Sequence, residues 1–199
     1  MSKYPNELLN LMNYFKRLPS VGSRTAERYV FQLLNWSQED LKNFSSLIAS
    51  LKNGVQFCST CGCFISSASC EFCDASKRDI QLICIISSPK DAYALEQTRT
   101  YKGLYHVLKG YFSPLEGKSL DPAQIEKLKS RLQKTEVKEV ILALDSTLEG
   151  DATALFLKEQ LHKLGIKVSR LAFGIPIGSS LDYVDGTTLA RSLSGRQSF

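Results

Sequence analysis

The first 54 residues place their hydrophobic side chains at the spacing of amphipathic helices. Apolar residues recur three or four positions apart through residues 6–18, and Pro19 ends the run. Ser23 follows as a candidate N-cap for a second helix. The apolar face of this second helix consists of Ala26, Tyr29, Val30, Leu33 and Leu34. The sequence therefore predicts two helices joined by a tight hairpin at residues 19–23.

A third helix is predicted to follow and to end at the pair Asn53 and Gly54. Ser37 and Asp40 have the spacing of a capping box, so we expect the helix to begin beside Ser37. The residues expected to face inward from it are Leu41, Phe44, Leu47, Ile48 and Leu51.

From residue 79 the pattern changes to short buried strands that alternate with helices. The predicted strands, rich in β-branched residues, are 80–88, 104–108, 138–144 and 166–173. The predicted helices are 89–97, 122–133, 151–164 and, in the tail, 188–193. Because strand and helix alternate, we expect an α/β fold with a doubly wound, mostly parallel sheet. We expect the chain to divide into a helix-hairpin-helix bundle at 1–54, a cysteine segment at 55–78, the sheet at 79–175 and a C-terminal extension at 176–199.

Composition narrows the class of protein only slightly. A chain of 199 residues can form one ordinary domain or two or three small ones. Its net charge of +5 indicates an anionic partner only if the basic residues gather on one surface. The longest apolar run, residues 82–86, is far shorter than the roughly 18 to 20 residues that span a bilayer, and the start has no signal-peptide pattern. We therefore expect a cytoplasmic protein that does not associate with membranes.

Five of the six cysteines lie in the stretch CSTCGCFISSASCEFC, residues 58–73. The pattern C-x2-C-x8-C-x2-C is formed by Cys58, Cys61, Cys70 and Cys73. In a reducing compartment such a cluster indicates a metal site rather than a disulfide framework, and two C-x2-C knuckles make a closed tetrahedral Zn²⁺ site. We predict one structural zinc ion per chain, which orders a segment too small to have its own core. Cys63 is left outside the site because C-x-C makes a poorer knuckle, and Cys84 is expected in the core of a strand.

The hairpin is a candidate phosphate site. Backbone N–H groups and the helix dipole favour an anion at the start of the second helix, where Gly22 lies in the turn. Arg24 and Arg28 are one helical turn apart, with Lys16 and Arg17 across the hairpin. Such a site would contact the DNA backbone without reading its sequence, and its affinity would fall steeply with salt. The alternative is an ordinary αα-hairpin with solvated arginines.

Three acidic residues, Asp145, Glu149 and Asp151, follow the strand predicted at residues 138–144. Open α/β sheets bind their ligands at this edge, where carboxylates can hold Mg²⁺ through water or meet a basic partner. Alternatively, Glu149 and Asp151 only stabilise the start of the next helix. The sequence has no phosphate-binding loop and no H-E-x-x-H motif, and neither histidine has an evident nucleophile to activate.

Six stretches, taken in order, resemble a known family. They are LPSVGSRTAERYVFQLL, the four-cysteine segment, ICIISSPKDAYALE, YHVLKGYFSPLEG, VILALDSTLEGDATA and GIPIGSSLDYVDGTTLARSLSGRQ. Their combination closely resembles the RecR family of bacterial recombination mediator proteins, and the likeness covers essentially the whole chain.

The resemblance implies that the sheet is a Toprim domain and that subunits assemble as a dimer or ring-like tetramer around DNA. It implies RecO and RecF as partners, with which the protein would help to load RecA onto gapped DNA or DNA coated with single-strand-binding protein. Arg24 and Arg28 match basic residues that face DNA in the family. Glu149 and Asp151 match acidic residues linked to engagement of a partner or DNA, and the C-terminal segment matches one that helps to pair subunits.

Two departures from known patterns affect the functional prediction. Ser20 stands where the family usually has glycine, which makes the hairpin less permissive of close phosphate approach. Catalytic Toprim enzymes have a glutamate and an Asp-x-Asp pair where this chain has Ser87 and the run Asp145, Ser146, Thr147. Since general acid–base chemistry and Mg²⁺ binding would both suffer, we predict a non-enzymatic, DNA-binding recombination mediator. The alternatives are a Toprim-type metal-dependent nuclease or topoisomerase-like enzyme, and a zinc-containing adaptor that binds only protein.

Overall fold

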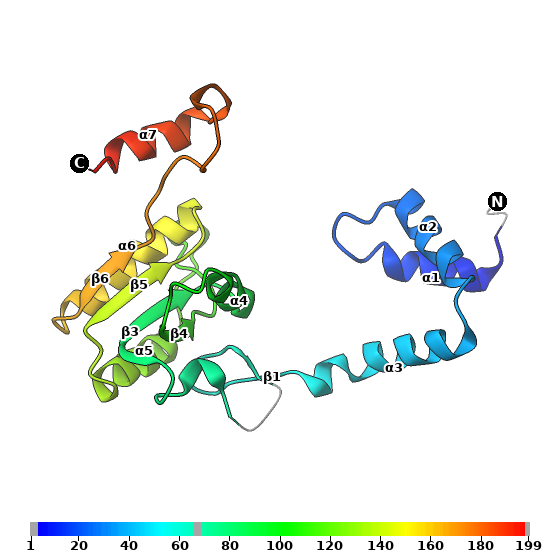
Figure 1. Cartoon of the computed structure of the whole chain (residues 1–199), viewed down its shortest axis with the longest axis horizontal. Helices are drawn as coiled ribbons and strands as arrows, with labels where there is room; N and C mark the ends of the chain where they lie inside the picture. Colours follow the sequence, from blue (N-terminus) through cyan, green and yellow to red (C-terminus); the bar gives the residue numbers. More distant parts are fainter. Residues whose placement is uncertain (1–3, 66–68, 198–199) are drawn as a thin grey trace. The chain divides into compact units, whose positions relative to one another are not determined.

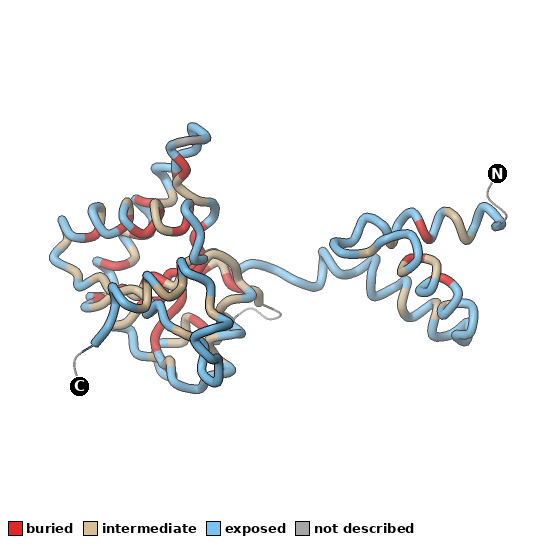
Figure 2. The backbone as a smooth tube through the Cα atoms, turned by 90° about the horizontal axis from the view of Figure 1, so that it is seen from above, coloured by how far each residue is buried: buried red, intermediate tan, exposed pale blue. Residues whose placement is uncertain are grey.

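The computed structural model describes residues 4–65 and 69–197. Internal contacts divide the chain into an N-terminal unit that ends at Val55 and a C-terminal unit that begins at Gln56 (Figure 1). Each unit has its own buried side chains, and most of the buried positions belong to the C-terminal unit (Figure 2). Within the described residues, no helix is both long and apolar enough to cross a membrane.

The N-terminal unit consists of the three predicted helices. They are α1 (Asn6–Phe15), α2 (Ser23–Leu33) and α3 (Gln38–Gly54). Its core is formed by Met12, Ala26 and Val30, with Leu8, Leu9, Phe15 and Val21 packed against them. The capping box before α3 is confirmed, because the Asp40 N–H donates to the Ser37 hydroxyl at 3.0 Å. A core of this size leaves much of the unit's apolar surface in contact with solvent.

Two predictions for this unit are wrong. The N-cap of α2 is Gly22 and not Ser23, which is the first helical residue, and no side chain caps the helix. The predicted inward face of α3 is also not buried: Leu47, Ile48 and Leu51 are 58–68% exposed. The pattern identified the amphipathic stripe correctly, but α1 and α2 offer too little apolar surface to cover it.

The C-terminal unit is built on a four-stranded sheet whose order is β4-β3-β5-β6. The strands are β3 (Asp79–Ile86), β4 (Gly103–Val107), β5 (Glu139–Ala143) and β6 (Lys167–Arg170). All neighbouring strands are parallel, which confirms the predicted α/β sheet. The connecting helices are α4 (Pro89–Gln97), α5 (Pro122–Lys134) and α6 (Leu148–His162). Short 3-10 turns lie at Pro114–Glu116 and Leu181–Tyr183.

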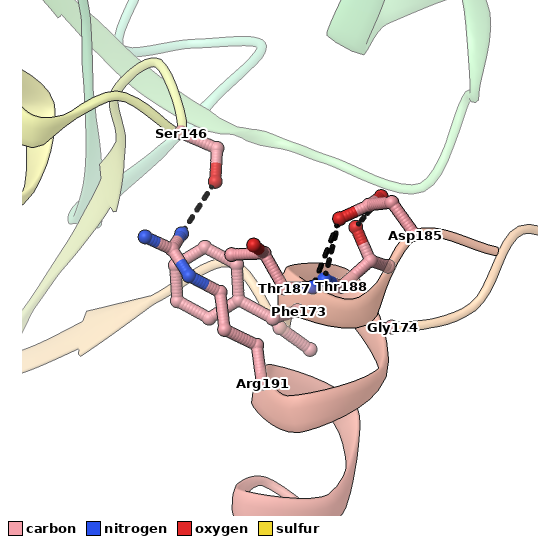
Figure 3. Close-up of a pocket in the computed structure, with 8 residues that line it drawn as sticks. Ser146, Phe173, Gly174, Asp185, Thr187, Thr188 and Arg191 are labelled. Carbon is pink, nitrogen blue, oxygen red and sulfur yellow. Dashed lines mark hydrogen bonds between the residues drawn. The ribbon is translucent and has the colours of Figure 1, made fainter.

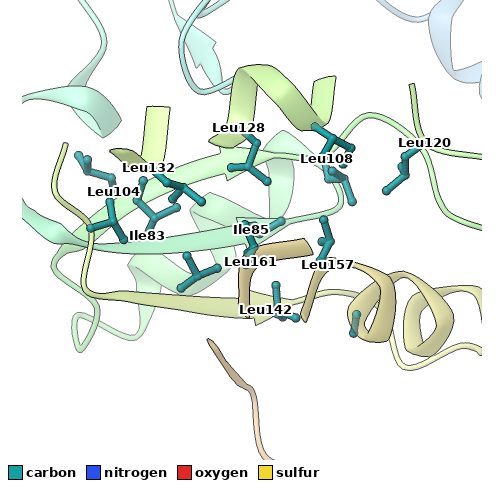
Figure 4. Packing of buried hydrophobic residues seen from close by; sticks show 14 residues of the cluster. Ile83, Ile85, Leu104, Leu108, Leu120, Leu128, Leu132, Leu142, Leu157 and Leu161 are labelled. Carbon is teal, nitrogen blue, oxygen red and sulfur yellow. The ribbon is translucent and has the colours of Figure 1, made fainter. Parts of the chain in front are cut away.

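Alternate residues of the central strand β3 belong to two separate cores. Ile83 and Ile85 lie in a cluster with Leu128 of α5 and Leu157 of α6, so both helices cover this face (Figure 4). Cys84 and Ile86 point to the opposite face, as the period of two along a strand requires. That alternation explains why β3 reads as a continuous apolar run.

The second face of the sheet is covered by α4 and by the cysteine segment. In this segment a two-residue antiparallel ladder joins β1 (Gln56–Phe57) to β2 (Phe64–Ile65), and a 3-10 turn follows at Glu71–Cys73. Cys61, Cys63 and Phe72 are buried in one cluster with residues of β3, β4 and α4. The cysteine segment is therefore part of the core of the C-terminal unit.

The start of α6 and the tail differ from the prediction in detail. Helix α6 begins at Leu148, three residues earlier than predicted, because the Thr147 hydroxyl accepts from the Gly150 N–H at 3.1 Å and caps it. In the tail, α7 (Gly186–Ser194) is capped by Asp185, which accepts from two backbone N–H groups. The predicted short helix of the C-terminal extension is thus confirmed and slightly longer.

Candidate metal centre and nucleic-acid interface

The four cysteines of the predicted zinc site lie together. The Sγ atoms of Cys58, Cys61, Cys70 and Cys73 are all within 4.8 Å of one another. Two of the separations are 3.5 Å, between Cys61 and Cys70, and 3.9 Å, between Cys58 and Cys73. A tetrahedral site with Zn–S bonds of about 2.3 Å has sulfur–sulfur edges of about 3.8 Å, whereas a disulfide bond is about 2.05 Å long. The four side chains are free thiols arranged to hold a metal ion.

Backbone hydrogen bonds fold the first pair of cysteines into a knuckle. The Gly62 N–H donates to the Cys58 carbonyl at 2.9 Å, and the Cys63 N–H points at the Cys61 sulfur at 3.4 Å. Gly62 has a φ of +80°, a conformation that favours glycine. A donor N–H directed at sulfur favours the thiolate form that a metal requires.

The crowding of the sulfurs shifts the thiol pKa values in opposite directions. Hydrogen bonds from Cys63 and Cys73 lower the pKa of Cys61. Burial, followed by hydrogen bonding to Cys61, raises the pKa of Cys70 to about 12. A thiolate at Cys61 thus makes Cys70 retain its proton, and a bound cation would allow both to be thiolates together.

Two further cysteines are buried outside the cluster. Cys63 is fully buried, and its backbone supports the knuckle while its sulfur is not among the four grouped atoms. Cys84 is 2% exposed on β3, and burial raises the pKa of its thiol to about 12. A thiol with a raised pKa and no access to solvent behaves as a small apolar side chain.

Two arginines that the sequence analysis missed hold the cysteine segment on the sheet. Arg78 donates to the Glu71 carbonyl at 3.0 Å and to the Glu96 carboxylate at 2.7 Å, and its guanidinium lies over the Phe72 ring. Arg131 of α5 donates to the Tyr105 carbonyl of β4 at 2.7 Å. Neither arginine belongs to a sequence motif. The one available signal would have been an arginine that stands among residues predicted to be buried.

The basic residues of the hairpin are solvent-exposed. Lys16 and Arg17 follow α1, while Arg24 and Arg28 lie one turn apart on α2. Among the residues that the structure describes, none of these four side chains forms an ion pair. Four exposed cations without an ion-pair partner, on the two helices that flank the hairpin, are available to a polyanion.

The start of α2 also leaves backbone donors free. Because Gly22 supplies no side-chain cap, the first N–H groups of the helix have no side-chain acceptor. Gly22 is exposed, and a Cβ added there would meet nothing within 4 Å. A phosphate oxygen could approach these N–H groups without steric hindrance. Ser20 beside this turn has a φ of +64°, which explains physically why a glycine suits that position.

The three acidic residues at the edge of the sheet are not brought together. Asp145 accepts a hydrogen bond from the Tyr111 hydroxyl at 2.6 Å. Glu149 and Asp151 lie in the first turn of α6, where negative charge is favourable. Within the described residues, the four cysteines are the only group of three or more His, Cys, Asp or Glu side chains close enough to share one ion. For Glu149, the geometry favours stabilisation of the start of α6 over a metal site shared with the other two carboxylates.

Asp151 pairs with two arginines from different elements. Its Oδ1 accepts from Arg170 of β6 at 2.6 Å, and its Oδ2 accepts from Arg191 of α7 at 2.8 Å. Both guanidinium groups also lie over the Phe173 ring, at 4.5 and 4.8 Å from its centroid. Both carboxylate oxygens are therefore engaged within the chain.

Helix α7 lies over the carboxyl edge of the sheet at this point. Arg191 donates to the Ser146 hydroxyl at 2.8 Å, across a hollow of about 440 Å³ lined also by Phe173 and Asp185 (Figure 3). The loop after β5 is thus in contact with the C-terminal segment. In many α/β proteins a ligand would approach this loop.

Models of known families match most of the described chain. The model of the RecR helix-hairpin-helix matches residues 8–52, and the model of the RecR C-terminal region matches residues 174–197. Between them, the Toprim domain matches residues 81–172, which cover the sheet. Along the sequence, the four-cysteine cluster lies between the region matched by the helix-hairpin-helix model and the region matched by the Toprim model.

Curated relatives match over their full length. The recombination protein RecR of Protochlamydia amoebophila (strain UWE25) is 51% identical over 197 residues, which cover 99% of this chain and 100% of that protein. The recombination proteins RecR of Chlamydia caviae and of Chlamydia trachomatis serovar D are each 44% identical over 201 residues, with both chains fully covered. On these matches and on the fold, the chain belongs to the RecR family, and its sheet is a Toprim domain.

Proposed function

We propose that this protein is a non-enzymatic DNA-binding mediator of recombinational DNA repair. It acts in the cytoplasm with RecO and RecF, and it helps to load RecA onto gapped DNA or DNA coated with single-strand-binding protein. The observation that carries the DNA-binding part is the hairpin, where Arg24 and Arg28 are exposed and unpaired beside uncapped N–H groups at the start of α2. Lys16, Arg17 and Gly22 complete this proposed surface.

The four cysteines hold one structural Zn²⁺ ion in this proposal. Four thiolates are the donor set of closed zinc sites, and their spacing fits the edges of a tetrahedron. When bound, zinc supplies charge neutralisation and geometry, and it leaves no position for a reacting water. The segment's contribution is to complete the second face of the sheet, since Cys61 and Phe72 are buried there.

The residues at the carboxyl edge of the sheet support the proposal that the protein does not catalyse a reaction on DNA. Ser87 follows β3 where catalytic Toprim enzymes need a carboxylate. Thr147 caps α6, and Ser146 accepts from Arg191, so these side chains stabilise the protein's own elements. Asp145 and Glu149 are proposed to engage a basic surface of a partner protein by charge, without a shared Mg²⁺ ion, while Asp151 holds Arg170 and Arg191 within the chain.

Self-association into a dimer or ring-like tetramer is part of the proposal. The stripe formed by Leu47, Ile48 and Leu51 on α3 is exposed, although its spacing is that of a buried face. A second copy of the chain could cover it. In a ring, several weak phosphate sites act together, so modest affinity in each subunit suffices.

The experiment that tests the proposal removes the two arginines together, as Arg24→Ala with Arg28→Ala. Fluorescence anisotropy with gapped and single-stranded DNA, at several salt concentrations, should show a loss of affinity of at least about tenfold. The salt dependence should also weaken by about one power of salt concentration per lost phosphate contact. Zinc content and assembly size should stay unchanged.

A matched control is Lys42→Ala with Lys52→Ala. It removes the same charge from the same unit, but from exposed positions on α3. The control should retain most of the DNA affinity. Unchanged DNA binding after loss of Arg24 and Arg28, or an equal loss in the control, would refute the role of the hairpin. Magnesium-dependent cleavage of the same DNA would refute the non-enzymatic assignment.

A further inference from the structure

We propose that Arg131 is an outer-sphere partner of the metal centre: its guanidinium donates to a metal-binding thiolate and determines how tightly the four cysteines hold their ion. This inference rests on the metal site proposed above. It adds to that site a residue from α5, far from the cysteines in sequence and on a different element.

The geometry places the charge of Arg131 against one sulfur. Its Nη2 lies 3.7 Å from the Cys73 Sγ, within the range of a hydrogen bond to sulfur. Its Nη1 donates to the Tyr105 carbonyl at 2.7 Å and contacts the His106 Nδ1 at 3.1 Å. These contacts fix the plane of the guanidinium, so that the remaining N–H groups are directed toward the cluster.

The tautomer of His106 supports this orientation. An arginine has only donors, so the contact with Nδ1 requires that nitrogen to be an acceptor and the proton to be on Nε2. His106 is 7% exposed, and a neutral ring there adds no positive charge beside the guanidinium. The ring thus positions Arg131 without competing with it for the thiolate.

Charge balance singles out Arg131 among the nearby cations. Four thiolates around one divalent ion carry a net charge of −2, which is costly to bury without a counter-charge. Arg78 already pairs with the Glu96 carboxylate. Arg131 pairs with no carboxylate anywhere in the described part of the chain, although it is half-buried. Among the described residues, the group in contact with it that would be anionic once a metal ion is bound is the cysteine cluster.

A second cation of α5, Lys127, contacts the backbone of the same segment. Its Nζ donates to the Ser59 carbonyl in the first knuckle at 2.5 Å. Lys127 and Arg131 are four residues apart and lie on one side of the helix. The positive side of α5 therefore faces both knuckles, but only Arg131 contacts a sulfur.

The physical consequence concerns metal affinity. A charged donor stabilises the thiolate against protonation and reduces the charge that the sulfur donates to the metal. Loss of such an outer-sphere partner typically lowers metal affinity about 10- to 100-fold. The fold of the metal-bound protein should survive, because the four ligands remain.

The test measures zinc affinity by chelator competition in the full chain, for Arg131→Met and Arg131→Lys. Arg131→Met should bind Zn²⁺ about 10-fold or more weakly, and Arg131→Lys should recover part of the loss because it retains the charge. Substitution with Co²⁺ gives a second readout: the bands of a four-sulfur site should persist, while the sulfur-to-cobalt charge-transfer band should shift in Arg131→Met. Lys129→Met, on the same helix but paired with Glu126, is the matched control and should resemble the wild type.

Each outcome decides between the alternatives. Wild-type zinc affinity and an unshifted charge-transfer band in Arg131→Met would overturn the inference. If Arg131→Met is insoluble, Arg131→Lys and Arg131→Gln are compared, and equal affinities for these two would overturn it as well. A wild-type protein with no zinc and no four-sulfur cobalt spectrum would instead refute the metal site itself. One zinc per wild-type chain with an unaffected variant would refute only the role of Arg131.

Discussion

The backbone N–H of Val107 donates a hydrogen bond to the carbonyl of Cys61 at 2.7 Å. This bond joins the first cysteine knuckle to the end of β4, an edge strand of the sheet. The next residue, Gly62, lies so close that an added Cβ would be 2.9 Å from the Val107 Cβ. Knuckle and sheet therefore stabilise each other, and ordering of the cysteine segment should be coupled to folding of the sheet.

A methyl group at Gly62 should break this coupling. Gly62→Ala introduces both a strained positive φ and a clash with Val107. Non-glycine residues in such a conformation cost about 1–3 kcal/mol, and the clash adds to this. We expect a lower free energy of unfolding and faster loss of zinc to a chelator, measured by urea denaturation and by metal release.

Gly110→Ala is the matched control for Gly62→Ala. Gly110 also has a positive φ, of +95°, but an added Cβ would meet nothing within 4 Å. This variant should show the strain alone and retain its zinc normally. Equal destabilisation and equal zinc loss in the two variants would mean that the approach to Val107 is not important.

Ser20→Gly should stabilise the N-terminal unit. The φ of Ser20 is +64°, a conformation that costs an L-residue about 1–2 kcal/mol, whereas glycine adopts it freely. The greater flexibility of glycine in the unfolded chain offsets part of the gain, so we expect a net gain of a few tenths to about 1 kcal/mol. Trp36, the only tryptophan, lies in this unit and packs on Phe44, so its fluorescence reports urea unfolding there.

Ser50→Gly provides the opposite control. Ser50 lies within α3, is exposed, and its hydroxyl donates to the Leu47 carbonyl in its own helix. Glycine inside a helix should destabilise the same unit by about 0.5–1 kcal/mol. If Ser20→Gly shifts the tryptophan transition in the same direction as Ser50→Gly, the strain at Ser20 is negligible.

Local patterns were sufficient to predict the sheet, the helices and the metal cluster. The apolar run that contains Ile83 and Ile85, and the C-x2-C spacing around Cys58 and Cys61, each depend on residues a few positions apart. Such periodicity determines which face of an element is buried. The two isoleucines therefore lie in the core and the two cysteines in the metal cluster, as the sequence predicts.

Relationships between distant elements were not predictable from these patterns. The bond between Arg131 and Cys73 joins residues 58 positions apart, and Arg191 meets Asp151 across 40 positions. A single arginine in a polar helix gives no sign of which acidic group it will meet. The stripe on α3 was identified, but its exposure was not predicted, because amphipathic spacing does not reveal whether a helix is covered within its own subunit.

Protonation of His106 should make the C-terminal unit lose stability in mild acid. Burial, followed by the charge of Arg131, lowers the pKa of His106 to about 4. Below pH 6.5 the His106 ring becomes protonated in the unfolded chain, whereas in the folded chain it becomes protonated only near pH 4. The stabilising contribution is thus fully present above pH 6.5 and is lost, by about 1.4 kcal/mol per pH unit, as the pH falls toward 4.

His106→Asn removes this pH dependence while keeping an acceptor for Arg131, because the Asn Oδ1 can replace Nδ1. Between pH 7 and pH 5, the wild type should lose about 2 kcal/mol more stability than the variant, in urea unfolding at the same saturating zinc concentration. Only the difference between the two proteins is used, since zinc binding weakens in both as thiolates become protonated. Parallel pH profiles would show that His106 is not kept neutral by the fold.

Loss of Arg191 should release α7 from the sheet. Arg191 joins this helix to the Asp151 carboxylate and the Ser146 hydroxyl, and its guanidinium lies over Phe173. These groups are about one-third exposed, so each contact is worth at most about 1 kcal/mol and the set about 1–2 kcal/mol.

In Arg191→Met, amide hydrogen exchange along α7 should accelerate roughly 5- to 30-fold, while exchange in β3 and β5 should be unchanged. Arg196→Met is the control, because within the described residues the Arg196 side chain donates to the Leu193 carbonyl of its own segment and not to the sheet. Equal protection of α7 in both variants would show that other contacts hold the helix, and that the charge pair with Asp151 does not.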